Sequence, residues 1–216
     1  MVEAADVEFV VRVVAETAVE NEKYFGDLDS VVGDGDFGYS LARGFEMVLD
    51  QWDSLDRTST GTFLQKVALM ITGRIGGTSG PIWGTAFLRA AAVAKTHDPL
   101  DGAAVVQMLT DAIEGIQARG GAALGDKTLL DALAPVRDTV AGLVADGTPA
   151  QAVLDAAAST ARTSADATTA LQARRGRASY TGERSIGSPD AGAVAVAVIL
   201  ERLAARWPEH SGARTT

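Results

Sequence analysis

Apolar residues recur at helical spacing along almost the whole of this 216-residue chain, and this periodicity is what most restricts its fold. In the first stretch, Val7, Val10, Val11, Val14 and Ala18 follow the i, i+3, i+4, i+7 pattern of one buried helix face. Comparable stripes predict eight helices, over residues 7–18, 41–52, 63–71, 82–95, 105–116, 130–143, a long segment that Thr148 and Pro149 open, and 188–207.

The composition favours helices that pack closely on small side chains. Hydrophobic residues make up 47% of the chain but aromatic residues only 6%, and Ala and Leu, both abundant, are strong helix formers. The β-branched run at residues 10–14 is the best strand candidate, yet its spacing fits a helix better. We therefore predict an all-α fold, a barrel or bundle of eight antiparallel helices, with one domain over residues 1–210 and a polar tail at 211–216.

Charge and cysteine usage exclude several classes of function. The net charge of −9 argues against nucleic acid as a partner, because phosphate backbones require a basic surface. The chain has no cysteine, so disulfides and thiolate metal sites are excluded. No apolar run approaches the ~20 residues that cross a bilayer, and the first residues lack the order of a signal peptide. We expect a cytoplasmic protein that binds neither nucleic acid nor membrane.

Glycines cluster in four of the predicted connections, before the second, fourth, sixth and eighth helices. In an antiparallel bundle these four connections lie at the same end, so the even-numbered helices all begin there. Their N-termini present unpaired N–H groups and the positive ends of helix dipoles, an arrangement that suits anions. The clusters are Gly33, Gly35 and Gly38; Gly73, Gly76, Gly77 and Gly80; Gly120, Gly121 and Gly125; and Gly176, Gly182 and Gly187.

The segment at residues 27–38 carries four aspartates in ten residues. Hard divalent cations need carboxylate oxygens, and glycines let a short loop fold around one point. A solvated acidic turn is the alternative, but Asp34 and Asp36 repel each other strongly without a cation. The G-x-G-x-x-G spacing lacks the strand and βαβ unit of a dinucleotide fingerprint. The calcium EF-hand pattern fails because Phe45 stands where its bidentate Glu belongs.

The other three glycine-rich loops carry groups that suit phosphate. The first, at residues 76–81, offers backbone amides and the hydroxyls of Thr78 and Ser79 as donors, although a plain interhelical loop is at least as good an interpretation. The segment GDKT at residues 125–128 lacks the spacing of a P-loop. The stretch at residues 174–184 is the most basic of an acidic chain, and arginine suits bidentate phosphate contact.

Taken together, the four loops resemble the nucleotide-binding (L) subunit of dihydroxyacetone kinases. The matching segments, in the family's order, are GDGDFG, GGTSGPIWGT, GDKTLLDAL and GRASYTGERSIGSPDAGA. The resemblance implies a barrel of eight antiparallel helices with ADP or ATP at one end and two magnesium ions. The family's metal pattern D-x4-D-x-D falls on Asp29, Asp34 and Asp36.

The resemblance also implies which residues contact the nucleotide and catalyse transfer. Arg177 and Ser79 would be catalytic, since they stabilise charge that develops on the transferred phosphoryl group. The cofactor-binding residues would be Ser40, Gly76, Gly77, Thr78, Ser79 and Arg177 around the phosphates, Gly121, Leu129 and Leu130 around the adenine, and Asp190 near the mouth.

In the family a separate K subunit or domain binds the small ketose, and some members receive phosphate from a phosphotransferase-system protein. This sequence departs from the usual loop, D-G-D-H-G-x-N-M, at Phe37, Ser40 and Leu41. Phe37 cannot donate or accept a hydrogen bond, which favours a second hypothesis, a nucleotide-loaded adaptor without turnover. A third is the nucleotide domain of a fatty-acid-type kinase, whose loop is similar.

Overall fold

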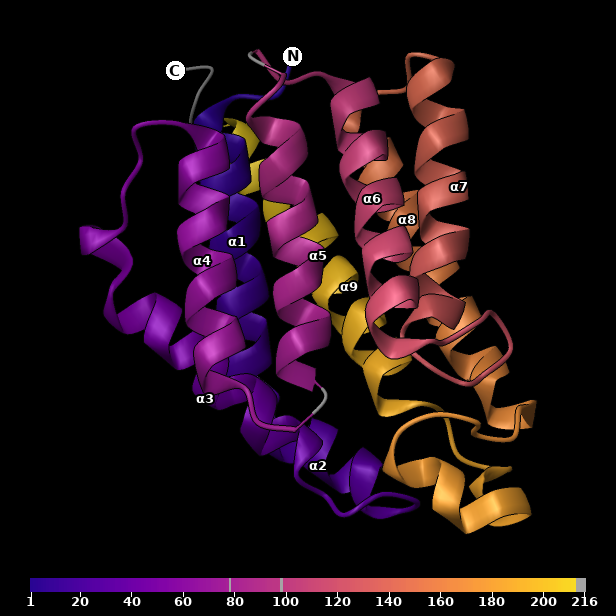
Figure 1. Cartoon of the computed structure of the whole chain (residues 1–216). Helices are drawn as coiled ribbons and strands as arrows, with labels where there is room; N and C mark the ends of the chain where they lie inside the picture. The colour runs from indigo at the N-terminus through magenta and orange to yellow at the C-terminus, as the bar shows by residue number, and fades with distance from the viewer. Residues whose placement is uncertain (78, 98, 213–216) are drawn as a thin grey trace.

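Nine α-helices and three short 3-10 helices make up the computed structural model, which describes residues 1–77, 79–97 and 99–212 (Figure 1). The α-helices are α1 (Ala4–Glu20), α2 (Glu22–Ser30), α3 (Phe37–Asp50), α4 (Thr60–Arg74), α5 (Ser79–Ala94), α6 (Gly102–Gly120), α7 (Leu130–Ala145), α8 (Ala150–Ala167) and α9 (Ala191–Gly212). The 3-10 helices are Trp52–Ser54, Thr168–Ala170 and Arg177–Ser185. The all-α prediction is confirmed.

Eight of the helices form a closed ring. Helices α3 to α9 each pack against the next in chain order, and α1 closes the ring by contacting both α9 and α3. Neighbouring helices in the ring run in opposite directions (Figure 1). These eight are the helices that the apolar stripes predict. The ninth, α2, was not predicted; it is a short helix that contacts α3 and α9 at one end of the barrel.

The core changes character around the ring. On the side of α1, α3, α4 and α5 it contains the largest fully buried side chains, among them Phe45 and Phe63. Between α7, α8 and α9 it is built almost entirely of alanine and valine. Small side chains let these helices approach closely, as the alanine content of the chain indicates.

The four glycine-rich connections lie at one end of the barrel, at the bottom of Figure 1, where α3, α5, α7 and α9 begin. These are the second, fourth, sixth and eighth predicted helices, so the prediction that they begin at the same end is confirmed. The N-terminus and the end of α9 lie at the opposite end (Figure 1).

The last helix is longer than the apolar stripe that predicted it. Helix α9 continues to Gly212, two residues into the predicted polar tail, and residues 213–216 lie outside the described part of the chain. The His210 ring stacks on Phe9 with centroids 4.2 Å apart, and its Nε2 lies 2.9 Å from Oδ1 of Asp6. These contacts with α1 stabilise the last turn of α9. Among the described residues, no helix combines the length and hydropathy required to cross a bilayer.

Gly84 permits the close approach of α4 and α5. A Cβ atom at this position would lie 1.8 Å from Oγ1 of Thr72 and 3.0 Å from its Cβ. The substitution Gly84→Ala therefore forces the two helices apart, and we expect it to lower the free energy of unfolding by about 2 kcal/mol. Urea unfolding followed by circular dichroism measures the change.

Gly142→Ala is the matched control, because Gly142 lies in α7 with nothing within 4 Å of its added Cβ. There, alanine should raise stability by about 0.5–1 kcal/mol through its better helix propensity. Equal stability changes in the two variants would contradict this description of the α4–α5 contact.

Candidate nucleotide and metal site

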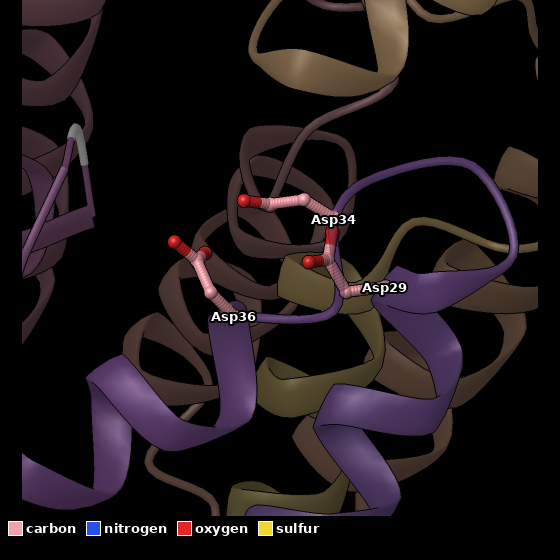
Figure 2. Close-up of side chains that lie close together, drawn as sticks. All are labelled: Asp29, Asp34 and Asp36. Carbon is pink, nitrogen blue, oxygen red and sulfur yellow. The ribbon is translucent and has the colours of Figure 1, made fainter.

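Three aspartates converge at the glycine-rich end of the barrel. Asp29 lies in the last turn of α2, Asp34 in the loop that follows, and Asp36 immediately before α3. One carboxylate oxygen from each lies within 4.8 Å of those of the other two, and the side chains point toward a common space (Figure 2). Repulsion between two such charges amounts to roughly 1–3 kcal/mol per pair, depending on how much water screens them. The arrangement suits a hard divalent cation.

The backbone of the loop is fitted to this cluster. Gly33 passes so close to Asp29 that an added Cβ would lie 2.2 Å from its Oδ1. The N–H of Phe37 donates to Oδ2 of Asp29 at 3.4 Å, which fixes the carboxylate against the start of α3. Glycine at position 33 is therefore required for Asp29 to face the other two aspartates.

Arg177 supplies positive charge to the cluster from a distant segment. Its Nη1 contacts Oδ2 of Asp34, and its Nη2 lies 3.2 Å from Oδ2 of Asp36. All three side chains are well exposed, so these ion pairs contribute little to stability. In this structure the guanidinium contacts the carboxylates, where the sequence predicted a phosphate contact.

A pocket of about 260 Å³ opens beside the aspartates, and all four glycine-rich connections line it. The polar residues that line it include Asp29, Asp34, Asp36, Gly76, Gly77, Ser79, Arg175, Arg177 and Asp190. The apolar residues that line it include Leu28, Val32, Phe37, Ile82, Trp83, Ile116, Ala122, Leu129 and Pro189. A pocket lined by both charged and apolar residues suits a ligand that joins an anion to a flat base.

A larger hollow of about 430 Å³ lies next to it over α3 and shares only Gly76 with the pocket. Of its two arginines, Arg43 and Arg74, Arg43 is already paired with Glu22 at 2.7 Å and with Glu46. Neither the aspartates nor the glycine loops other than that of Gly76 reach it. The smaller pocket is therefore the better candidate site despite its volume.

Three predicted contact residues do not line the pocket. Ser40 lines the neighbouring hollow instead, because it lies on the outer side of the first turn of α3. Leu130 is fully buried and packs in the core with Ile113 and Ile116. Gly121 ends α6 in a left-handed conformation with φ +62°, and its neighbours Gly120 and Ala122 line the pocket in its place. A further predicted residue, Thr78, lies outside the described residues.

Asp190 lies where the sequence predicted, at the start of α9, and its Oδ2 accepts the Ala193 N–H at 2.8 Å. Burial raises the pKa of its carboxyl to about 7, and the Asp131 carboxylate adds to the rise, while the N–H groups of Ala193 and Gly192 and the Lys127 ammonium oppose it. Asp190 therefore holds a proton at pH values where an aspartate free in water is ionised.

Some residues of the site were not predicted. Lys127 is buried and lines the pocket, and Asp126 beside it accepts hydrogen bonds from the Ala123 N–H and from Nε of Arg175. Nothing in the sequence marks these charged residues as buried, since each has a partner more than 40 positions further along the chain.

The chain is similar to a known domain family and to characterised proteins of that family. The model of the DAK2 domain matches residues 31–205. The chain is 36% identical over 182 residues to the PEP-dependent dihydroxyacetone kinase, ADP-binding subunit DhaL, of Escherichia coli, and the match covers 84% of this chain and 87% of that subunit. It is 34% identical over 206 residues to the L-erythrulose 1-kinase of Mycolicibacterium smegmatis, a match that covers 93% of this chain but 35% of that protein.

A solved structure shares the fold. The dihydroxyacetone kinase from C. freundii, in complex with AMP-PNP and Mg²⁺, superposes with a TM-score of 0.73 and 26% sequence identity. The match covers 92% of this chain and 33% of that one. The chain therefore spans most of the E. coli subunit but about a third of the longer kinases.

The raised pKa of Asp190 predicts a dependence of stability on pH in the nucleotide-free protein. Between about pH 4 and about pH 7 the unfolded chain has ionised this carboxyl while the folded protein still holds its proton. The wild type therefore loses stability relative to Asp190→Asn as the pH rises through this window. The loss is at most about 4 kcal/mol, and smaller because solvent enters the pocket.

Urea unfolding of both proteins from about pH 5 to about pH 8 measures this difference. Asparagine keeps an oxygen that accepts the Ala193 N–H, so the start of α9 is preserved. A stability difference that stays constant over the whole range would contradict the raised pKa.

Proposed function

The chain belongs to the DAK2 domain family, and from this membership and the pocket we propose that it is the nucleotide-binding subunit of a dihydroxyacetone-type kinase. In this proposal it transfers a phosphoryl group from magnesium-bound ATP, or from ADP recharged by a phosphotransferase-system protein, to a short ketose on a separate K subunit. The observation that carries the proposal is the convergence of three aspartates on a pocket that four helix N-termini surround.

Asp29, Asp34 and Asp36 would hold magnesium, in a set of two ions. Their oxygens fit a hard cation in type and in spacing, and Gly33 leaves the room that Asp29 requires. When bound, magnesium neutralises phosphate oxygens and so lowers the barrier to attack on phosphorus. The carboxylates themselves serve to orient the ions and to keep them at one side of the pocket.

Residues at the start of α5 would bind the phosphates. Gly77 has φ +62°, a left-handed conformation that turns the backbone toward the pocket, and the helix dipole adds positive potential there. The Ser79 hydroxyl at the first position of α5 would donate to a phosphate oxygen. Arg177 would exchange its contacts with Asp34 and Asp36 for a phosphate oxygen, where it would stabilise the charge of the transition state.

Apolar residues that line the pocket would hold the adenine. They include Leu129, at the start of α7, together with Ile82 of α5 and Ile116 of α6. Burial of the base against these side chains excludes water from one end of the nucleotide and leaves its phosphates directed at the aspartates.

A covalent intermediate on this chain is not part of the proposal. The sequence has two histidines, His97 and His210, and neither is among the residues that line the pocket. His210 lies at the end of α9, at the opposite end of the barrel (Figure 1). Transfer would therefore depend on positioning and electrostatics alone.

The adaptor hypothesis rests on Phe37, and the structure offers a packing reason for this residue. Its ring lies against Phe25 with centroids 6.1 Å apart, and it contacts the hydrophobic core. Loss of a polar side chain at this position is thus balanced by apolar contact. No contact in the pocket specifically favours a fatty-acid-type kinase.

Reconstitution tests the proposed activity. Mixed with a ketose-binding subunit, the protein should transfer phosphate to dihydroxyacetone or erythrulose from ATP or from a phosphorylated carrier protein. Mass spectrometry of the sugar phosphate detects the product, and the donor that works identifies the branch of the family. Tight ADP binding without transfer from either donor would favour the adaptor instead.

Asp34→Asn tests the metal site, because it keeps the shape of the side chain and removes its charge. Wild-type protein should bind ADP at least ~10-fold more tightly with magnesium than with a chelator, and Asp34→Asn should lose most of this difference, since a phosphate tail needs cations between it and the carboxylates. Isothermal titration calorimetry measures both affinities.

Asp27→Asn is the matched control. Asp27 lies on α2, shortly before the loop that carries Asp34, but it is exposed, pairs with Lys23 at 2.6 Å and is not part of the cluster. It should bind ADP as the wild type does. Equal ADP affinities for wild type and Asp34→Asn, with and without magnesium, would refute the metal site.

A further inference from the structure

Lys127 is a fully buried ammonium whose hydrogen bonds all go to one distant segment. Its Nζ lies 3.1 Å from the Leu171 carbonyl oxygen, 2.5 Å from that of Ser185 and 2.6 Å from that of Ser188. An ammonium has three donors, so every one of them is used. The side chain is only 3% exposed, and burial lowers the pKa of the ammonium. Without these carbonyls, burial of the charge would be very costly.

The backbone at Lys127 is held in an unfavourable conformation. Its φ of +62° is the only left-handed value of a non-glycine residue among residues 1–77, 79–97 and 99–212. Such a conformation costs a side-chain-bearing residue about 1–2 kcal/mol, and glycine would adopt it freely. The hydrogen bonds of the lysine side chain therefore offset the conformational strain at this position.

Asp126 holds the same segment, residues 171–188, at a second point. Its carbonyl oxygen accepts the Arg174 N–H at 3.0 Å, and its Oδ2 lies 3.1 Å from Nε of Arg175. The two neighbouring residues thus hold the segment at residues 171–188 near its start and near its end.

The segment at residues 171–188 has little else to hold it. It buries one hydrophobic side chain, Ala173, while Tyr180 is 89% exposed. Ser185 is buried, but its hydroxyl bonds within the segment, with the Ala173 N–H and the Gly182 carbonyl. A segment with so few apolar contacts depends on its polar anchors for a fixed position.

The same segment forms one wall of the nucleotide pocket. Residues 175–178 line it, and Arg177 reaches across to Asp34 and Asp36. We propose that Lys127 is a positioning residue that fixes this wall, and that it thereby sets how slowly a bound nucleotide leaves. The part of this inference that concerns the nucleotide rests on the proposed function; the anchoring of the segment does not.

Lys127→Met tests the inference, because methionine is an unbranched side chain of similar length that lacks the ammonium. Trypsin serves as a probe, since the segment carries Arg174, Arg175, Arg177 and Arg184. Cleavage after these arginines should be at least ~10-fold faster than in wild type, because release of the segment exposes its backbone. ADP should dissociate at least ~10-fold faster in stopped-flow measurements with magnesium, while its association rate stays within about threefold.

Two further variants separate anchoring from general destabilisation. Lys95→Met removes an exposed lysine whose Nζ bonds to Gln65, and it should match the wild type in both measurements. Lys127→Gly relieves the strained φ. If the ammonium is what holds the segment, trypsin should cleave this variant as fast as Lys127→Met. Wild-type resistance in Lys127→Gly would show that only the turn conformation is required and would overturn the inference.

Three further outcomes would each overturn a part of the inference. Wild-type rates of cleavage in Lys127→Met would overturn the anchoring itself. Faster cleavage with unchanged ADP dissociation would overturn the role in nucleotide retention. If the wild-type protein binds no ADP, the proposed function fails and the retention role with it, while the trypsin measurement still decides the anchoring.

Discussion

Repulsion among three carboxylates is the constraint on which the candidate site depends. Asp29, Asp34 and Asp36 are held within 4.8 Å of one another by a glycine loop between α2 and α3. Such a cluster requires positive charge, and in this structure Arg177 provides it from a segment more than 140 residues away in the chain. The barrel supplies more, because four helices begin at this end of it (Figure 1) and residues at their N-termini line the pocket. An anionic ligand with divalent cations balances both sets of charges at once.

Much of the fold follows from patterns that are local in the sequence. The eight ring helices are long enough, at 14 to 22 residues, for an apolar stripe to be visible, and glycine clusters mark where they turn. Helix α2 was not predicted because its nine residues bury a single side chain, Phe25, and one buried residue does not form an apolar stripe. The apolar stripe of the last helix ends at Trp207, five residues before the end of α9, because the last turn is polar and is stabilised by contacts with α1.

The residues of the site could be predicted where a single short loop brings them together. The three aspartates lie within eight positions of one another, so their convergence follows from a short turn. Leu129 and Leu130 are adjacent and differ by about 100° around a helix axis, so the sequence could not say which one faces the pocket. Lys127 looks like an exposed charge in the sequence. Its burial depends on carbonyls 44 to 61 positions further along, which no local pattern encodes.

The most direct test of this account is a crystal structure of the protein grown with ADP and manganese, whose anomalous scattering locates the ions. The account predicts peaks about 2.1 Å from carboxylate oxygens of Asp29, Asp34 and Asp36, bridged to the phosphates, with Arg177 withdrawn from the aspartates. Manganese held by phosphate alone, with Arg177 still paired to Asp34 and Asp36, would contradict it.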